Sequence, residues 1–364
     1  MPSEVCPYRS VPRNIHIVVN LTARLSESLL NSDTARTTDE CDVQKGICVR
    51  GLQIYRASDS TSGMGVNNHV LRLLLHARKQ GAKFDRTITI GRLDALLTPT
   101  QLEQEFAAFG EHLEPGEAQR LLHARDRYCE PIIERLGAQI VDSLDASDYE
   151  GASVIHDLNA PIAEERKGRY SLVIDGGTLE HVFHFPEALK TCMSLAEVGG
   201  HVMLCLPANN EMGHGFYQFS PDLFFRAFSD ENGYRLKGVF LVPAYSDGEW
   251  LKVGDPALLR QRVGYNRSIE ELTILVLAER MRDVPLFAKP PQQSDYVAAW
   301  SEKNENRMAF FDSATAKENV IEGRRKLRAF IPEPVLRLRR ILHAGRSVTA
   351  GPDPQQFQRF DPRA

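Results

Sequence analysis

Three aspartates stand where apolar, β-branched stretches of the chain end. Asp145, Asp157 and Asp175 each lie at or near the end of such a stretch. In an open α/β sheet, ligands bind beyond the carboxyl ends of the strands. An acid after the second strand can accept hydrogen bonds from both hydroxyls of a ribose, and one after the third can reach an adenine amine. A lone aspartate at such a place is also an ordinary helix cap or turn former, but three in series favour a nucleotide-like ligand.

A histidine bracketed by glycines follows a further expected strand. His214 lies within the sequence GHGFYQF, three residues before Tyr217, and the strand before it ends near Asn209 and Asn210. Because the pKa of a free imidazole is about 6.5, His214 can take a proton from a hydroxyl group near neutral pH. We therefore predict that His214 is catalytic and that Tyr217, Asn209 and Asn210 bind the substrate. The alternative is that His214 only forms hydrogen bonds within a tight turn.

Two further histidines, His181 and His184, lie three residues apart, so their side chains could share one face of a helix. Metal binding needs further ligands in suitable geometry. The sequence identifies none, so no metal site is predicted. We expect His181 to line the site as a second catalytic residue. Glu180 is predicted to bind the substrate, with a purely structural carboxylate as the alternative.

Strand and helix patterns alternate along the chain and must position these residues. Apolar, β-branched runs predict strands at residues 86–91, 138–145, 153–159, 170–175, 201–207, 234–245 and 271–279. Helical spacing of apolar residues predicts helices at residues 67–80, 99–136, 186–196 and 219–233. Apolar strands separated by helices predict an α/β, Rossmann-like fold, with a mostly parallel sheet and helices on both faces.

The segment from Tyr170 to Phe228 resembles the fourth strand, the following helix and the fifth strand of class I S-adenosylmethionine-dependent methyltransferases. The residues that match the family pattern in order and spacing are Tyr170, Val173, Leu179-Glu180-His181-Val182, Ala188-Leu189 and Gly199-Gly200. Ser171 stands where the family usually has an acid. The resemblance is weaker over the rest of residues 67–279, which include the expected strands on either side.

This resemblance implies a seven-stranded sheet whose last strand is antiparallel, with S-adenosyl-L-methionine bound across the first strands. It implies that Asp145 binds the ribose of this cofactor. It also implies that Asp157 and Leu158 flank the adenine. Asp175 and Gly176 would line the methionine end.

Two departures from the family pattern affect the predicted cofactor site. After the first strand the family usually has several glycines, which let the backbone approach the cofactor closely. This chain has TITIGRLDALL, in which Gly91 is followed by the bulky cation of Arg92. We still assign Gly91 and Arg92 to the cofactor site, with Asp94 as a partial replacement for the missing acid. The second departure is a long helical insertion at about residues 93–137, which could be a lid, part of the acceptor pocket, a structural addition or an oligomer surface.

Three parts of the chain are expected: an N-terminal extension at residues 1–65, a methyltransferase-like domain at 66–284, and a C-terminal part at 285–364. The last part is expected to contain a linker, a basic helical segment and a disordered tail from Pro352. The basic segment, residues 323–346, has eight arginines and lysines against one acid. It either makes peripheral contact with a surface such as a membrane or packs on its own domain.

The charge, the cysteine spacing and the motifs of the chain argue against several classes of protein. A net charge of −4 disfavours a dedicated nucleic-acid binder. The six cysteines form no CxxC pair, which argues against a zinc ribbon or a disulfide framework. Neither a signal peptide nor a transmembrane stretch is recognisable, so a cytoplasmic location is predicted. No Walker-type or dinucleotide-binding glycine motif follows an expected strand.

Two hypotheses of different class fit these observations. The first is a methyltransferase that uses S-adenosylmethionine and acts on a small polar acceptor, with O-methylation of a sugar or secondary metabolite as the expected reaction. The second is a catalytically inactive pseudo-methyltransferase that serves as a binding or scaffold protein, which the altered glycine loop would favour. Binding of the cofactor discriminates between them.

Overall fold

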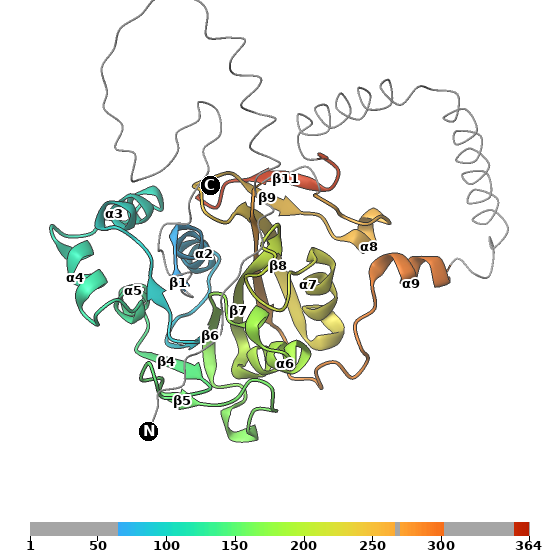
Figure 1. Cartoon of the computed structure of the whole chain (residues 1–364), viewed down its shortest axis with the longest axis horizontal. Helices are drawn as coiled ribbons and strands as arrows, with labels where there is room; N and C mark the ends of the chain where they lie inside the picture. The colour runs from blue at the N-terminus through green and yellow to red at the C-terminus, as the bar shows by residue number, and fades with distance from the viewer. Residues whose placement is uncertain (1–64, 266–269, 302–352, 364) are drawn as a thin grey trace, which may run out of the picture. The chain divides into compact units, whose positions relative to one another are not determined.

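The computed structural model describes residues 65–265, 270–301 and 353–363 (Figure 1). The N-terminal extension and the basic segment at residues 323–346 were predicted in parts of the chain that lie, apart from residue 65, outside the described residues.

A nine-stranded sheet forms the centre of the described part, in the order β11-β9-β8-β10-β7-β6-β2-β4-β5. Its strands are β2 (Arg86–Ile90), β4 (Ile140–Asp145), β5 (Val154–Ile155), β6 (Tyr170–Asp175), β7 (Ala196–Asn209), β8 (Tyr234–Pro243), β9 (Trp250–Val253), β10 (Leu272–Arg280) and β11 (Phe357–Phe360). The strands from β5 to β7 are parallel, and β10 is antiparallel to both β7 and β8. This confirms the Rossmann-like α/β fold and the antiparallel strand that the resemblance to class I methyltransferases implies.

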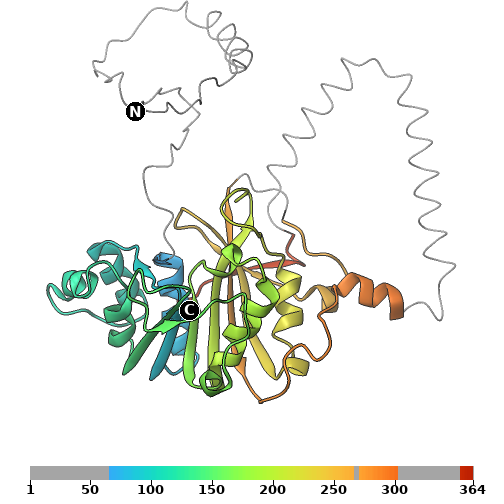
Figure 2. The ribbon, with the colours of Figure 1, turned by 60° about the horizontal axis from the view of Figure 1, so that its bottom comes forward.

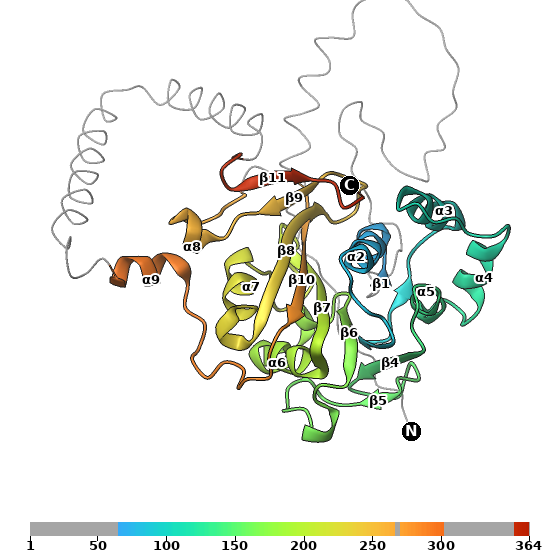
Figure 3. The ribbon, with the colours of Figure 1, turned by 180° about the vertical axis from the view of Figure 1, so that it is seen from behind.

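The expected number of seven strands is wrong, because β9 and β11 extend the sheet beyond β8 (Figure 3). β11 pairs antiparallel with β9. Its Phe360 ring lies 4.6 Å from Phe240 and 6.3 Å from Trp250 between ring centroids. The tail was expected to be disordered, and over these residues that expectation is wrong: two aromatic side chains give the tail an apolar surface to bury.

The helices cover both faces of the sheet. They are α2 (Asn68–Lys79), α3 (Pro99–Ala108), α4 (Glu117–His123), α5 (Glu130–Arg135), α6 (Phe185–Leu195), α7 (Pro221–Ala227), α8 (Pro256–Leu259) and α9 (Ser294–Ser301). Along β6 the side chains alternate between two apolar clusters, as the pleat of a strand requires. Val173 packs with α6 and α7, whereas Leu172 and Ile174 pack with α2 and α5.

Local signals set the bounds of these helices. Asn67 caps α2 by accepting hydrogen bonds from the backbone N–H groups of His69 and Val70. Thr98 and Gln101 form a capping box at the start of α3. The insertion after β2 is helical as predicted, and Figure 2 shows its helices gathered beyond the β2 and β4 end of the sheet.

Three short elements complete the site region. β1 (Gly65–Val66) pairs with β3 (Asp94–Ala95) in a separate two-stranded sheet. The 3₁₀ turn η2 (Leu179–His181) follows β6.

Within the described residues, no helix combines the length and the apolar composition needed to cross a membrane.

Candidate functional site

The carboxyl ends of β2, β4, β6 and β7 lie at one edge of the sheet, because these strands are parallel and adjacent. The residues predicted to carry chemistry follow these ends and divide into two groups. We call the region around β2 and β4 the donor half, and the region around β6 and β7 the acceptor half.

The turn after β2 is tight and its backbone is well bonded. Gly91 has a φ of 74°, which glycine adopts without strain. Its N–H donates to the carbonyl oxygen of Leu144 at 2.7 Å, and the hydroxyl of Thr89 donates to its carbonyl oxygen, also at 2.7 Å. A single glycine therefore makes the turn that the sequence pattern left in question.

Arg92 connects the helical insertion to the loop after β4. Its Nε donates to Oε1 of Glu130 at 2.7 Å, and an Nη atom donates to the carbonyl oxygen of Glu150 at 2.6 Å. The guanidinium carbon lies 3.9 Å from the centroid of the Tyr128 ring. The predicted cofactor-binding cation is thus engaged with protein groups on three sides.

The expected methionine end of the cofactor site, at Gly176 after β6, is also occupied by protein groups. A Cβ added at Gly176 would lie 3.0 Å from Cδ1 of Leu93, so the Leu93 side chain packs directly on this glycine. The N–H of Gly65 donates to the carbonyl oxygen of Gly176 at 3.3 Å. β1 and the turn after β2 therefore cover the end of β6.

The two acids predicted for the ribose and adenine form local turns. Oδ1 of Asp145 accepts a hydrogen bond from the N–H of Ser147 at 3.1 Å. Oδ1 of Asp157 accepts from the backbone N–H of Asn159 at 2.9 Å, which lowers the pKa of this exposed carboxyl. Leu158 is 6% exposed and belongs to the apolar core. Their cofactor roles remain predictions.

In the acceptor half, Asp175 is buried at the end of β6. Its Oδ1 accepts a hydrogen bond from the N–H of Thr178 at 2.8 Å, and the Thr178 hydroxyl donates to the carbonyl oxygen of Ile90 at 2.7 Å. Its other oxygen, Oδ2, is buried without a hydrogen-bond partner among the described residues. Burial and the nearby carboxylate of Glu180 raise the pKa of Asp175 to about 8.

Glu180, His181 and His214 form a compact cluster beside Asp175. Oε1 of Glu180 lies 3.4 Å from Nε2 of His214 and 3.9 Å from Nε2 of His181. The two imidazole rings are 5.3 Å apart between centroids. Glu180 is 1% exposed, whereas the side chains of His181 and His214 are 45% and 24% exposed. The buried carboxylate therefore holds two histidines that solvent and ligands can reach.

The backbone explains why residues from two distant segments meet here. Glu180 and His181 lie on η2, and His214 lies in the turn after β7. The N–H of Phe216 donates to the carbonyl oxygen of Glu180 at 2.8 Å. A Cβ at Gly215 would lie 2.9 Å from Cγ of Glu180, so only glycine permits this approach. Glu180 raises the pKa of His214 by hydrogen bonding to the imidazole.

Glu211 is a member of this half that the sequence reasoning missed. Burial raises its pKa to about 7, and its Oε1 is buried without a hydrogen-bond partner among the described residues. Its carbonyl oxygen accepts a hydrogen bond from the N–H of His214 at 3.1 Å. The only signal in the sequence was its place in the same turn as His214.

Two exposed phenylalanines flank the cluster. Phe183 and Phe216 are 75% and 69% exposed, and their rings meet edge to face at 6.3 Å between centroids. The hydroxyl of Tyr217 donates to the carbonyl oxygen of Phe183 at 2.7 Å and fixes this segment. These aromatic faces were not assigned from the sequence, although the aromatic residues around His214 were the available signal.

The remaining predicted site residues have structural contacts. Nδ2 of Asn209 donates to the carbonyl oxygen of Tyr265 at 3.4 Å, and Nδ2 of Asn210 donates to that of Glu270 at 2.9 Å. His184 does not join His181: its Nδ1 lies 3.2 Å from the carbonyl oxygen of Asn159, at the start of α6. Substrate binding by the two asparagines stays a prediction.

The charges of the two halves differ. In the donor half, Glu130 pairs with Arg92, while Asp94 and Glu150 pair with Arg127 at 2.9 and 3.1 Å. In the acceptor half, no arginine or lysine among the described residues forms an ion pair with Asp175, Glu180 or Glu211.

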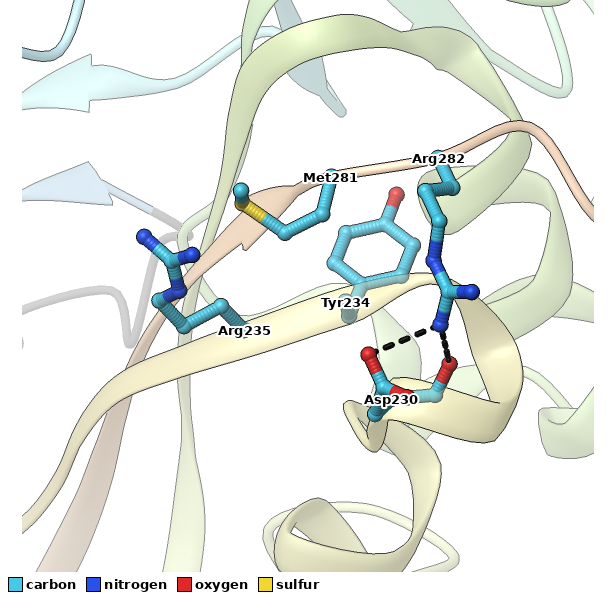
Figure 4. A pocket seen from close by; sticks show the side chains of 5 residues that line it. All are labelled: Asp230, Tyr234, Arg235, Met281 and Arg282. Atoms are coloured by element: carbon cyan, nitrogen blue, oxygen red, sulfur yellow. Dashed lines mark hydrogen bonds and ion pairs between the residues drawn. The ribbon is translucent and has the colours of Figure 1, made fainter.

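A pocket of 460 Å³ lies elsewhere, lined by Asp230, Tyr234, Arg235, Met281 and Arg282. Figure 4 shows Arg282 reaching Asp230, with which it forms an ion pair of 2.7 Å. Tyr234 begins β8, which runs parallel to β7, and Met281 follows the antiparallel β10. This pocket is therefore at the opposite edge of the sheet from the candidate site.

No protein-family model and no curated protein sequence matches the chain. Among solved structures, it is similar to the 1,6-didemethyltoxoflavin N1-methyltransferase of Burkholderia thailandensis, with 11% identity, coverage of 59% of this chain and 78% of that chain, and a TM-score of 0.32. A branched-chain polyamine synthase mutein of Thermus thermophilus gives 13% identity, 60% and 56% coverage, and a TM-score of 0.31. A 16S rRNA (adenine(1408)-N1)-methyltransferase mutant of Catenulisporales acidiphilia gives 10% identity, 60% and 94% coverage, and a TM-score of 0.29. Likenesses of this strength identify no activity, and the fold assignment rests on the strand order.

Proposed function

We propose that the protein is an S-adenosylmethionine-dependent methyltransferase that methylates a hydroxyl group of a small polar acceptor, such as a sugar or another secondary metabolite. One observation carries the proposal. A buried glutamate holds an accessible histidine, Glu180 with His214, at the carboxyl edge of a sheet that has the class I strand order.

Methyl transfer to a hydroxyl requires positioning of the acceptor and removal of its proton. His214 is the base in this proposal, and Glu180 orients its imidazole. The exposed rings of Phe183 and Phe216 offer apolar surface against which the C–H face of a sugar or a planar ring can pack. S-adenosylmethionine would supply the electrophilic methyl group.

In the donor half, Asp145 is the best-placed ribose ligand. It ends β4 and is half-buried, and only its Oδ1 has a hydrogen-bond partner among the described residues. The proposal therefore needs the ribose to bind at Asp145, next to the turn at Gly91.

Titration of the purified full-length protein with S-adenosylhomocysteine, followed by calorimetry, tests this proposal. We expect saturable binding that Asp145→Ala weakens by about tenfold or more. Asp148→Ala is the matched control, because Asp148 lies in the same loop and is exposed. Absence of binding at millimolar ligand would overturn the proposal, and equal affinity of the two variants would refute the role of Asp145.

A second candidate is a protein with the methyltransferase fold that binds a partner without catalysis. The observation that favours it is the occupation of the donor half by Arg92 and by Leu93, which packs on Gly176. The same titration decides between the two candidates, since a non-catalytic protein has no need to bind S-adenosylhomocysteine.

A further inference from the structure

We propose that Glu180, His181 and His214 bind a divalent transition-metal cation, with Zn²⁺ as the best match. Metal binding itself is independent of the function proposed above. The use of the ion to activate an acceptor hydroxyl rests on that function.

The geometry of the three side chains suits one ion. Each residue offers one ligand atom, and the three atoms lie within 4.8 Å of one another. Ligand atoms about 2.1 Å from a tetrahedral Zn²⁺ are about 3.4 Å apart. The Nε2 atom of His214 is already 3.4 Å from Oε1 of Glu180, and that of His181 is 3.9 Å away. Small side-chain movements would complete the arrangement.

The charge around the cluster is the second, independent observation. Glu180 is 1% exposed, and its Oε2 has no hydrogen-bond partner among the described residues. A buried carboxylate is costly unless a positive charge compensates it. No arginine or lysine of the described chain does so, and a bound cation would.

The types of ligand select the kind of ion. Two imidazoles with one carboxylate suit Zn²⁺ and other first-row transition metals, whereas Mg²⁺ prefers oxygen ligands. The partial exposure of both histidines gives an ion a path from solvent and leaves a coordination position open.

An open position gives the ion a chemical use. A hydroxyl group coordinated to Zn²⁺ loses its proton much more readily than in water. The O–H bond of the acceptor would break, with its proton passing to solvent water. The resulting alkoxide would attack the methyl carbon while the C–S bond of the donor breaks. With the ion bound, His214 is a ligand, and coordination replaces its role as a base.

Direct metal binding tests the proposal without donor or acceptor. The full-length protein is freed of metal by dialysis against a chelator and titrated with Co²⁺, whose visible absorption reports coordination, followed by competition with Zn²⁺. We expect one Co²⁺ per chain, an intense four- or five-coordinate spectrum, and displacement by Zn²⁺. Absence of a one-to-one complex, or tighter binding of Mg²⁺ than of Zn²⁺, would overturn the proposal.

Variants locate the ion. His181→Ala and His214→Ala should each weaken Zn²⁺ binding by at least tenfold, whereas His184→Ala should leave it unchanged because the His184 ring contacts the carbonyl oxygen of Asn159 instead. His181 is half-exposed, so its replacement leaves folding intact, which circular dichroism verifies. Equal affinity in His181→Ala and His184→Ala would refute the site. Zn²⁺ binding without S-adenosylhomocysteine binding would leave the metal site standing and remove the proposed methyl transfer.

Discussion

The donor half and the acceptor half lie at one edge of one sheet, yet they differ in whether their acidic side chains form ion pairs with arginine. In the donor half, three acids form ion pairs with guanidinium groups: Glu130 with Arg92, and Asp94 and Glu150 with Arg127. In the acceptor half, the neighbours of the Glu180 carboxylate are the imidazoles of His181 and His214, and no arginine or lysine of the described residues forms an ion pair with it. In the donor half, ion pairs of Arg92 and Arg127 link the insertion to the loop after β4. In the acceptor half, buried carboxyl oxygens of Asp175, Glu180 and Glu211 have no hydrogen-bond partner among the described residues.

Replacing His214 should have the largest effect. With turnover of an acceptor measured as release of S-adenosylhomocysteine, His214→Ala should reduce kcat/KM by about 10²–10⁴-fold, the usual contribution of a proton-transfer group. The loss is expected whether His214 acts as a base or as a metal ligand. His184→Ala should retain full activity, and equal losses in both variants would place the chemistry elsewhere.

Removing the ion pair between Arg92 and Glu130 in the donor half should destabilise the protein. Glu130→Ala leaves the half-buried guanidinium of Arg92 without its carboxylate and should reduce the free energy of unfolding by about 2 kcal/mol. Urea denaturation measures the change. Glu134→Ala is the control, since its pair with Arg125 is exposed and should contribute at most about 0.5 kcal/mol. Equal losses of stability in Glu130→Ala and Glu134→Ala would show that the Arg92–Glu130 pair contributes no more than an exposed surface ion pair.

The acceptor half should show a smaller, pH-dependent effect through Asp175. Its pKa of about 8 in the folded protein lies above that of an unfolded aspartate. The stabilisation is therefore fully present below about pH 4 and is lost as the pH rises to about 8. In metal-free protein, Asp175→Asn should therefore remove a decline of at least about 1 kcal/mol in the free energy of unfolding between pH 5 and pH 8. Parallel profiles of the free energy of unfolding against pH for the wild type and Asp175→Asn would contradict the raised pKa of Asp175.

Much of the fold could be predicted from the sequence. Mostly apolar runs such as the one at residues 170–175 form strands that are buried on both faces, and such runs are recognisable in the sequence. The edge strand at residues 357–360 was missed, because four residues are too few to show a strand pattern. Its partner strand contains Trp250, more than a hundred residues earlier, and the Phe360 ring packs against that side chain. Pairing over such a distance leaves no local pattern.

The sequence singled out the three residues of the Glu180 cluster but not their arrangement in space. His181, His214 and Glu180 were each nominated, but their meeting depends on the close approach of Gly215 to Glu180. Arg92 was recognised as unusual, yet its partners Glu130 and Glu150 come from the insertion and a later loop. The absence of a compensating charge is a property of burial in three dimensions, which a residue pattern does not contain.

The most direct test of the account is the stability of Glu180→Gln with and without Zn²⁺. Glutamine keeps the shape and the hydrogen bond but removes the buried charge. We predict that the metal-free variant is more stable than the wild type by about 1 kcal/mol, a gain of the kind seen when function holds an unfavourable charge in place. With Zn²⁺ at about a hundred times its Kd, the wild type should gain about 2.7 kcal/mol and the order should reverse. A variant that is less stable under both conditions would contradict the claim that Glu180 is held for a cation.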